Sequence, residues 1–306
     1  MAKHTNIAWA TSTFNPWIGC TKVAPGCDNC YADAIDKRMR FGGELHWGVG
    51  APRHRTSASN WAQVRTWNRK AAAGQRPWRV FCGSLADIFD NEVPQSWRWE
   101  LWHLINETPA LQWLIVTKRV GNVPTMVPQC WYNVAGFPAN VRLLITVCNQ
   151  QEADRDIPKL LALPCDNGIS YEPALEPVNF REWLEPFNEL DATMKPPNRP
   201  QWIIVGGESA QGRRTSARPF DLQWARDTIA QCKAADVPVF VKQLGSNIIV
   251  PNDSVNEWPN EEAFFDNISD DYIPQYQGEL MPLYLQDRAG ADPNEWPTDL
   301  RVQEFP

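Results

Sequence analysis

Short apolar runs recur along the chain and are separated by stretches with a helical pattern. The runs predict strands near Phe14–Ile18, Arg79–Cys82, Trp113–Val116, Leu143–Val147, Gly168–Tyr171, Trp202–Val205 and Val239–Val241. Helices are predicted between them at Tyr31–Met39, Ser96–Ile105, Glu152–Leu161 and Asp221–Ala235. In the last helix, Asp221 is a suitable N-cap, and Val237-Pro238 ends the segment. Buried strands that alternate with helices predict an α/β fold with a parallel sheet, as a partial or complete (β/α) TIM-type barrel.

Polar or glycine-containing clusters follow nearly every apolar run. The polar residues at these strand ends are Lys118, Arg119, Asn149, Glu172, Glu208, Lys242 and Gln243. In a (β/α) barrel the carboxyl ends of the strands converge on one mouth, where cofactor and substrate bind. One such residue alone is more typical of a loop than of a catalyst, so the prediction rests on their recurrence.

Two segments do not fit the repeat. Residues 41–78 are long for a βα connection and predict an insertion at the mouth or at an edge, with a helix near Ser59–Ala72. Residues 251–306 are rich in Pro, Asp, Glu, Asn and Trp and predict an irregular extension packed on the barrel. Its expected anchors are Trp258, Phe264, Phe265, Tyr272, Tyr284 and Trp296. We therefore expect a barrel domain over residues 1–250 and an acidic extension over 251–306.

Charge is unevenly distributed along the 306 residues. The net charge is −7, but residues 251–306 hold 13 acidic and two basic residues, whereas residues 1–80 hold 12 basic and four acidic ones. A basic front suits a polyanionic partner, although a solvated surface is the plainer explanation. No apolar run is long enough to span a bilayer, and the first residues lack the apolar core of a secretion signal. Eight cysteines are too few for a disulfide scaffold, so we expect a protein of the reducing cytoplasm.

Three cysteines lie together in "GCTKVAPGCDNCYA", at Cys20, Cys27 and Cys30. They could bind zinc if a fourth donor joined them, for which the candidates are His46, His54 and Cys82. They could be inert thiols, although buried cysteines usually lie in regular elements. They could also hold a [4Fe–4S] cluster with one iron left open for a small molecule. The residues alone leave these alternatives open.

The position of the cysteine loop, between the first strand and the first helix, resembles that of the radical S-adenosylmethionine superfamily. The resemblance is closer still to a family of bacteriophage and bacterial three-cysteine proteins described as of unknown function. It covers about residues 7–245 through the blocks "FNPWIGCTKVAPGCDNCYA", "FCGSLADIF", "SYEPALEPV", "WIIVGGESAQGRRTSARPFD" and "VPVFVKQLG". The superfamily commonly spaces its cysteines by three and then two residues, whereas this chain has six and then two.

The resemblance implies a [4Fe–4S] cluster held by the three cysteines and S-adenosylmethionine on its open iron, cleaved to a 5′-deoxyadenosyl radical that abstracts a hydrogen atom. It implies that Gly83, Ser84 and Asp87 meet the methionine amino group and that Lys118 or Arg119 pairs with the carboxylate. Tyr31 joins these cofactor contacts. Thr146 and Asn149 would meet the ribose, and Gly206, Gly207, Glu208 and Ser209 the adenine. Glu172, Lys242 and Gln243 are left for substrate binding or proton handling.

The substrate prediction rests on charge and family context. Arg65 and Arg69 share a helix face flanked by Trp61, Trp67 and Trp78, which suggests a phosphate clamp with stacking surfaces. Further arginines near the mouth are Arg213, Arg214 and Arg218. We expect an isomerase or related enzyme that rearranges an amino-acid-decorated thymine in phage DNA, in the host cytoplasm, with flavodoxin or ferredoxin as electron donor. The alternatives are a zinc-stapled binding module and a radical enzyme acting on tRNA, a peptide or a small molecule.

Overall fold

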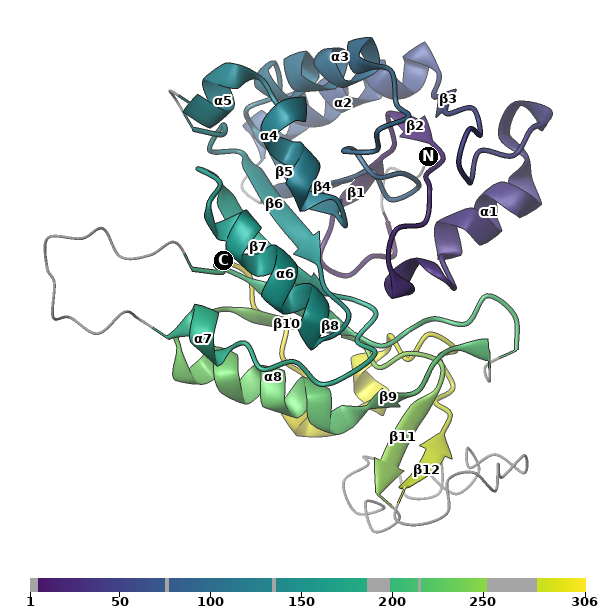
Figure 1. Ribbon diagram of the computed structural model, residues 1–306, viewed down its shortest axis with the longest axis vertical. Coiled ribbons are helices and arrows are strands. Elements are labelled where there is room, and N and C mark those ends of the chain that lie inside the picture. Colours follow the sequence, from purple (N-terminus) through teal and green to yellow (C-terminus); the bar gives the residue numbers. More distant parts are fainter. Residues whose placement is uncertain (1–4, 75–76, 134–135, 186–198, 214–215, 252–279) are drawn as a thin grey trace, which may run out of the picture. The chain divides into compact units, whose positions relative to one another are not determined.

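The computed structural model describes residues 5–74, 77–133, 136–185, 199–213, 216–251 and 280–306 (Figure 1). The chain divides into two compact units. The first consists of Met1–Thr146 and Arg155–Gly168, and the second of Val147–Asp154 and Ile169–Pro306. The chain passes from one unit to the other inside helix α6 (Gln150–Leu161) and strand β7 (Asp166–Tyr171).

The first unit contains parallel strands of the large sheet, each paired with the next one named. They are β1 (Ser12–Phe14), β4 (Trp78–Cys82), β5 (Leu111–Thr117) and β6 (Val141–Thr146). Its helices are α1 (Tyr31–Met39), α2 (Ala58–Ala73), α3 (Gln95–Asn106), α4 (Val123–Met126) and α5 (Gln129–Asn133). Strand β5 is apolar and buried along most of its length, as expected for a parallel strand covered on both faces. The predicted alternation of strands and helices is confirmed here.

The first predicted strand is interrupted after Phe14. Pro16 has no N–H to donate to a sheet, and the side chain of Asn15 instead accepts from Leu85 N at 2.7 Å. The chain then forms the short strand β2 (Trp17–Ile18), which pairs antiparallel with β3 (His54–Arg55) of the predicted insertion. The single strand predicted over Phe14–Ile18 is therefore wrong, because it joins two strands of different sheets.

Tryptophans of the first unit fill its core. Trp113 and Trp67 are almost fully buried, and Trp61 is 7 % exposed. The Trp67 and Trp78 rings stack with centroids 6.4 Å apart, and Phe14 meets Trp61 edge-on at 5.4 Å. The expectation that Trp61 and Trp67 offer stacking surfaces to nucleic acid is wrong, because both rings pack inside the protein.

The second unit contains the remaining parallel strands. Strands β8 (Ile203–Gly206) and β10 (Val239–Gln243) pair with each other, and β8 also pairs with β7. A smaller sheet consists of β9 (Phe220–Asp221), β11 (Ile248–Pro251) and β12 (Leu280–Leu283). Helix α7 spans Arg181–Leu184, and α8 (Leu222–Ala234) packs against β8 and β10 (Figure 1). Asp221 caps α8 as predicted, because its side chain accepts from Gln223 N.

The described part of the C-terminal segment packs on the second unit. Val241 N donates to Val302 O at 2.8 Å, and Glu304 N donates to Val239 O at 3.0 Å. Trp296 is fully buried, which confirms it as an anchor, whereas Tyr284 is half-buried. The other predicted anchors, at positions 258, 264, 265 and 272, lie outside the described residues. Residue 250, where we expected the barrel to end, lies inside β11.

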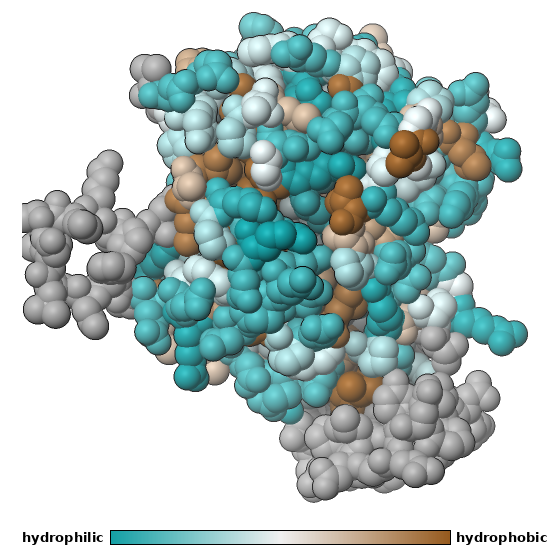
Figure 2. Space-filling view, in the orientation of Figure 1, coloured by the Kyte–Doolittle hydropathy of each residue, from teal (hydrophilic) through white to brown (hydrophobic). Residues whose placement is uncertain are grey.

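The surface drawn in Figure 2 is mainly hydrophilic, with apolar side chains in small separate groups. Within the described residues, every helix is too short or too polar to span a bilayer.

Candidate functional site

The cysteine loop begins at a tightly packed point of the first unit. Gly19 has a φ of +112°, and a Cβ there would lie 2.4 Å from the His46 carbonyl oxygen. Gly19 N donates to Leu85 O at 3.0 Å, and the backbone of the next residue, Cys20, forms an isolated parallel β-bridge with the backbone of Trp47. The backbone of Cys20 is therefore set by contacts with two distant segments, and only glycine fits before it.

The other two cysteines lie where a short turn leads into α1. Cys27 ends a 3-10 turn over Pro25–Cys27, and Cys30 is the N-cap residue of α1. Tyr31, the next residue, donates its hydroxyl to Ser84 O at 2.6 Å. This bond ties the end of the cysteine loop to the loop after β4.

All three cysteines line one cavity of about 130 Å³, which we call the cysteine cavity. Other predicted cofactor residues that line it are Tyr31, Gly83, Ser84, Asp87, Lys118 and Thr146. Gly83, at the end of β4, has a φ of +86°, which lets the chain turn back under the cavity. The structure thus brings together nearly all the predicted cofactor residues of the first unit.

Asp87 is largely occupied by internal contacts. Its carboxylate accepts from Thr117 Oγ1 at 2.8 Å, from Lys118 N at 3.0 Å and from Phe89 N at 2.9 Å. It is 7 % exposed. These bonds join the loop after β4 to the end of β5, so the structure gives Asp87 a positioning role in the cavity wall.

Arg119 lies against Cys20. Its Nη2 donates to Thr21 O at 2.7 Å and lies 3.8 Å from Cys20 Sγ. Burial works against the guanidinium charge, but the nearby carboxylates and thiol outweigh it, so the pKa of Arg119 is raised. Burial raises the pKa of the Cys20 thiol to about 12; Asp87 and Asp90 raise it too, and Arg119 opposes them. Because a thiol binds metal as the thiolate, a metal at Cys20 would have to displace the thiol proton.

Arg53, which the sequence analysis did not single out, holds the insertion against the cysteine loop. Its side chain is 1 % exposed. It donates to Asp90 Oδ2 at 2.8 Å, to Thr21 Oγ1 at 2.7 Å and to Ala51 O at 2.7 Å. An arginine in a polar, proline-containing segment carries no sequence signal of burial, so this role could not be found from the pattern.

The second unit brings together the residues assigned to substrate or proton handling. Lys242 Nζ lies 2.6 Å from Glu172 Oε2. Gln243 Nε2 donates to Gly207 O at 2.8 Å and to Ser209 Oγ at 2.7 Å. The prediction that these strand ends gather polar side chains is confirmed for this set within the second unit.

Several predicted site residues of the second unit already make contacts within the protein. Glu208 is 6 % exposed and accepts from Arg218 N at 2.9 Å and from its guanidinium. A Cβ on Gly207 would lie 2.4 Å from Leu244 O, so close backbone packing is enough to require this glycine. Asn149 Oδ1 accepts from Glu152 N at 2.8 Å at the start of α6, and the ribose contact of Asn149 stays a prediction.

Arg65 and Arg69, predicted to bind phosphate, do not line the cysteine cavity of their unit. Arg65 forms an exposed ion pair with Glu107 at 2.6 Å, and Arg69 donates to Thr66 Oγ1 at 3.1 Å. In the second unit, the Arg213 carbonyl accepts from Ser216 N. Arg214 lies outside the described residues.

The zinc alternative needs a fourth donor beside the three cysteines. Among the described residues, no three His, Cys, Asp or Glu side chains are grouped closely enough to hold a single metal ion. Of the candidate fourth zinc donors, the His46 ring bonds to Asp36 at 2.8 Å, Cys82 is fully buried in β4, and the His54 ring packs against the rings of Phe41 and His46. The three thiols therefore share a cavity without forming a site for a single ion among the described residues.

A family model described as "Protein of unknown function (DUF5131)" matches residues 4–272. No curated protein matches the chain. Among solved structures, a cysteine-to-serine variant of spore photoproduct lyase is 13% identical, with 92% of this chain and 71% of that chain covered and a TM-score of 0.43. A double variant of the same lyase with bound AdoMet and dinucleoside spore photoproduct is 12% identical, with 90% and 68% covered and a TM-score of 0.40. Likeness this distant leaves the assignment of a site to the chain's own residues.

Proposed function

Because this chain belongs to the DUF5131 family, whose description names no activity, we propose its function from its own residues: a radical S-adenosylmethionine enzyme that modifies a nucleobase. The observation that carries the proposal is the cysteine cavity. Cys20, Cys27 and Cys30 line it together with residues from the ends of β4, β5 and β6. If the three thiols are the protein ligands of a [4Fe–4S] cluster, one iron is left open to a small molecule.

The chain's own residues would hold and orient the cofactor. The three cysteines would bind a [4Fe–4S] cluster, and Arg119, beside Cys20, would offset part of the thiolate charge. Tyr31, Gly83 and Ser84 shape one wall, while Lys118 and Thr146 contribute polar groups from the neighbouring strand ends. When bound, the cluster and S-adenosylmethionine supply a 5′-deoxyadenosyl radical for C–H abstraction. The protein's contribution is to hold the radical carbon and the C–H bond of the substrate at near-contact distance.

We assign proton handling or substrate binding to the second unit. Glu172 and Lys242 form an ion pair there, and Gln243 is held in place by Gly207 and Ser209. Adenine contacts at Gly206, Gly207, Glu208 and Ser209 remain part of the proposal. Glu208 would make them through its backbone, because its carboxylate is taken by Arg218.

The proposed substrate is DNA carrying a thymine decorated with a small amino-acid-derived group, which the enzyme rearranges. The support is the basic first 80 residues, with 12 Lys and Arg against four Asp and Glu, together with exposed arginines such as Arg65 and Arg69. A base inside a duplex would have to be extruded to reach a cavity of this kind. A flavodoxin or ferredoxin is proposed as electron donor, with the protein in the reducing cytoplasm.

The test of the cofactor is the metal content of anaerobically reconstituted protein. We expect a brown protein with about four irons per chain that releases 5′-deoxyadenosine when it is reduced with S-adenosylmethionine. Replacing Cys20, Cys27 and Cys30 by Ala should abolish both the iron binding and the release of 5′-deoxyadenosine. Cys130→Ala is the matched control, because Cys130 is an exposed thiol on α5. A colourless protein that holds stoichiometric zinc would overturn the proposal and favour the binding module.

The test of the substrate class is the rate of 5′-deoxyadenosine release with different additions. Decorated-thymine DNA should accelerate it, while unmodified DNA, tRNA and peptides should not. Acceleration by tRNA or a peptide alone would retain the radical chemistry and overturn the DNA assignment.

A further inference from the structure

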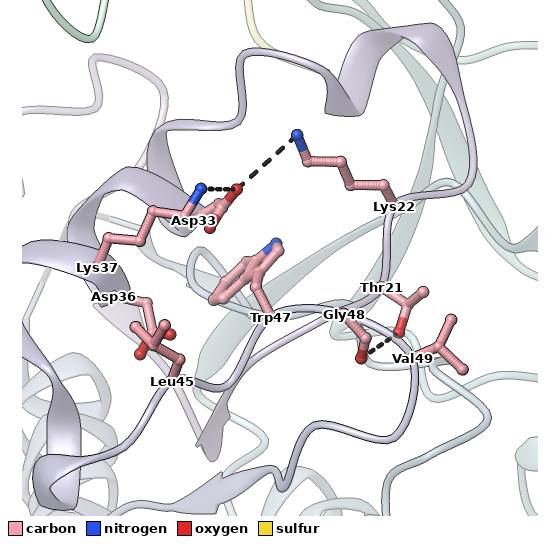
Figure 3. Close-up of a pocket in the computed structure, with 9 residues that line it drawn as sticks. All are labelled: Thr21, Lys22, Asp33, Asp36, Lys37, Leu45, Trp47, Gly48 and Val49. Carbon is pink, nitrogen blue, oxygen red and sulfur yellow. Dashed lines mark hydrogen bonds and ion pairs between the residues drawn. The ribbon is translucent and has the colours of Figure 1, made fainter.

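A second and larger cavity adjoins the cysteine loop in the first unit. It measures about 410 Å³, within the range of small-ligand sites, and we call it the lysine cavity. Figure 3 shows its lining residues, which are Thr21, Lys22, Asp33, Asp36, Lys37, Leu45, Trp47, Gly48 and Val49. Thr21, Lys22 and Trp47 line both this cavity and the cysteine cavity, so the two share a wall.

Asp33 places an unsatisfied acceptor in the lysine cavity. The residue is 6 % exposed, and its Oδ2 lies 3.0 Å from Lys37 Nζ and 3.8 Å from Lys22 Nζ. Its Oδ1 is buried without a hydrogen-bond partner among the described residues. A buried carboxylate oxygen without a donor is costly, so a ligand that brings an N–H group to this atom would gain from it.

Trp47 provides an aromatic surface in the same cavity. Its backbone is fixed by the bridge to Cys20, and its half-buried indole lies between Asp33 on one side and Gly48 on the other (Figure 3). Leu45 and Val49 add apolar surface that is 42% and 86% exposed. A planar, heteroaromatic group would find a stacking partner and an apolar rim here.

The cavity carries positive charge at its edge. The side chains of Lys22 and Lys37 are 43% and 63% exposed, so both ammonium groups can reach a ligand in solvent. The remaining acid, Asp36, is committed to His46, whose backbone N lies 2.7 Å from its Oδ2. Two lysines against one shared carboxylate disfavour a cationic ligand and favour an anionic one.

We propose that the lysine cavity binds one unpaired nucleotide of the substrate strand. Its base stacks on Trp47 and donates from its edge to Asp33 Oδ1, and its phosphate meets Lys22 and Lys37. The shared wall would then direct the adjoining nucleotide to the cysteine cavity. This inference rests on the proposed function for its choice of nucleic acid, and it adds a subsite that reads a neighbour of the modified base.

The binding test uses the reconstituted full chain and a labelled short single-stranded oligodeoxynucleotide, followed by fluorescence anisotropy. Trp47→Leu should weaken binding about tenfold or more, because base–aromatic stacking is lost, while Trp47→Phe should retain most of the affinity. Trp99→Leu on α3, where the ring is 41% exposed, is the control and should bind as the parent does. Equal affinities for Trp47→Leu and Trp99→Leu would overturn the proposal.

The charge test compares two exposed lysines. Lys37→Gln should lower the slope of log Kd against log salt by about 0.7, the value for one phosphate contact on a single strand. Lys70→Gln, on the exposed side of α2, should leave the slope unchanged. Equal slopes for the two variants would overturn the phosphate contact, and this comparison holds even if the Trp47 variants fold poorly.

The outcome for this subsite can be separated from the outcome for the proposed function. Protein that holds iron and releases 5′-deoxyadenosine, but binds no oligonucleotide, would overturn the nucleotide subsite and leave the radical chemistry. Protein without iron whose oligonucleotide binding is lost in Trp47→Leu would overturn the radical chemistry and support the subsite.

Discussion

The strand ends of the two units use their polar side chains differently. Around the cysteine cavity, Asp87 and Arg119 lie 3.9 Å apart as an ion pair, and each also bonds to the backbone of a neighbouring loop, Asp87 at Lys118 N and Arg119 at Thr21 O. In the second unit, the polar side chains pair with one another, as Glu172 does with Lys242 and Glu208 does with Arg218. In the first unit three sulfurs line a cavity, whereas in the second the named carboxylates are already paired with basic side chains. A polar residue at a strand end is therefore a stronger ligand candidate when its side chain is not already bonded within the protein.

The largest expected effect tests the rigid frame around the cysteine loop. Arg53→Met would remove the ion pair at 2.8 Å from Asp90, which is 1 % exposed and keeps a longer ion pair with Arg119, so the free energy of unfolding should fall by about 3–5 kcal/mol. Arg55→Met is the matched control, since the Arg55 side chain is 33% exposed and its pair with Glu100 lies at the surface. Urea denaturation measures both. Equal urea midpoints for Arg53→Met and Arg55→Met would mean that Arg53 does not hold the cysteine loop.

A second prediction compares one buried carboxylate from each unit. Asp87→Asn and Glu208→Gln should each lower the free energy of unfolding by about 1–3 kcal/mol in the absence of cofactor, because each acid accepts several internal bonds. Urea denaturation of the cofactor-free protein measures this. If Asp87→Asn keeps its midpoint and loses only affinity for S-adenosylmethionine, Asp87 is a ligand and the contrast between the units fails at that residue.

A third prediction concerns the ion pair at the ends of β7 and β10. A double-mutant cycle with Glu172→Gln and Lys242→Met should give a coupling of about 0.5–1 kcal/mol, since both groups are partly buried. The Arg226–Asp299 pair, in which the Asp299 side chain is 53% exposed, should couple less. Additive effects of the Glu172 and Lys242 changes would show that their contact does not persist in solution.

The smallest effect concerns the surface of α2. Arg65→Gln should change the free energy of unfolding by less than about 0.5 kcal/mol, because Arg65 and Glu107 are both more than half exposed. If Arg65 contacts phosphate, the salt slope of duplex DNA binding should fall by about 0.9. An unchanged slope would identify it as a solvated surface charge.

Much of the fold could be predicted from the apolar pattern. Six of the seven predicted strands correspond to parallel strands of the structure, and α1 spans Tyr31–Met39 as expected. The first predicted strand is wrong because the apolar residues Phe14, Trp17 and Ile18 suggest one strand, whereas Asn15 and Pro16 between them divide it. Short antiparallel pairs such as β2 with β3 join segments far apart in sequence, and a local pattern does not contain that information.

The site was predictable where residue type and position agreed. The cysteines and the residues after β4, β5 and β6 do line one cavity, because parallel strands place their carboxyl ends together. The bond that Asn149 makes at the start of α6 is local, because its acceptor oxygen meets Glu152 N three residues on, and it was overlooked in the sequence analysis. The burial of Arg53 was not predictable, because it depends on Asp90 and Thr21, which are distant in sequence.

The bridge at Cys20 and the helix that starts after Cys30 have a consequence for metal uptake. Cys20 lies on backbone held by its β-bridge to Trp47, and Cys30 lies at the start of α1, whereas Cys27 lies in the short 3-10 turn between them. Each of the three cysteines thus lies in a segment with backbone bonds of its own. If the proposed cluster binds here, protein contacts order its ligands, which lowers the entropy that metal binding has to offset.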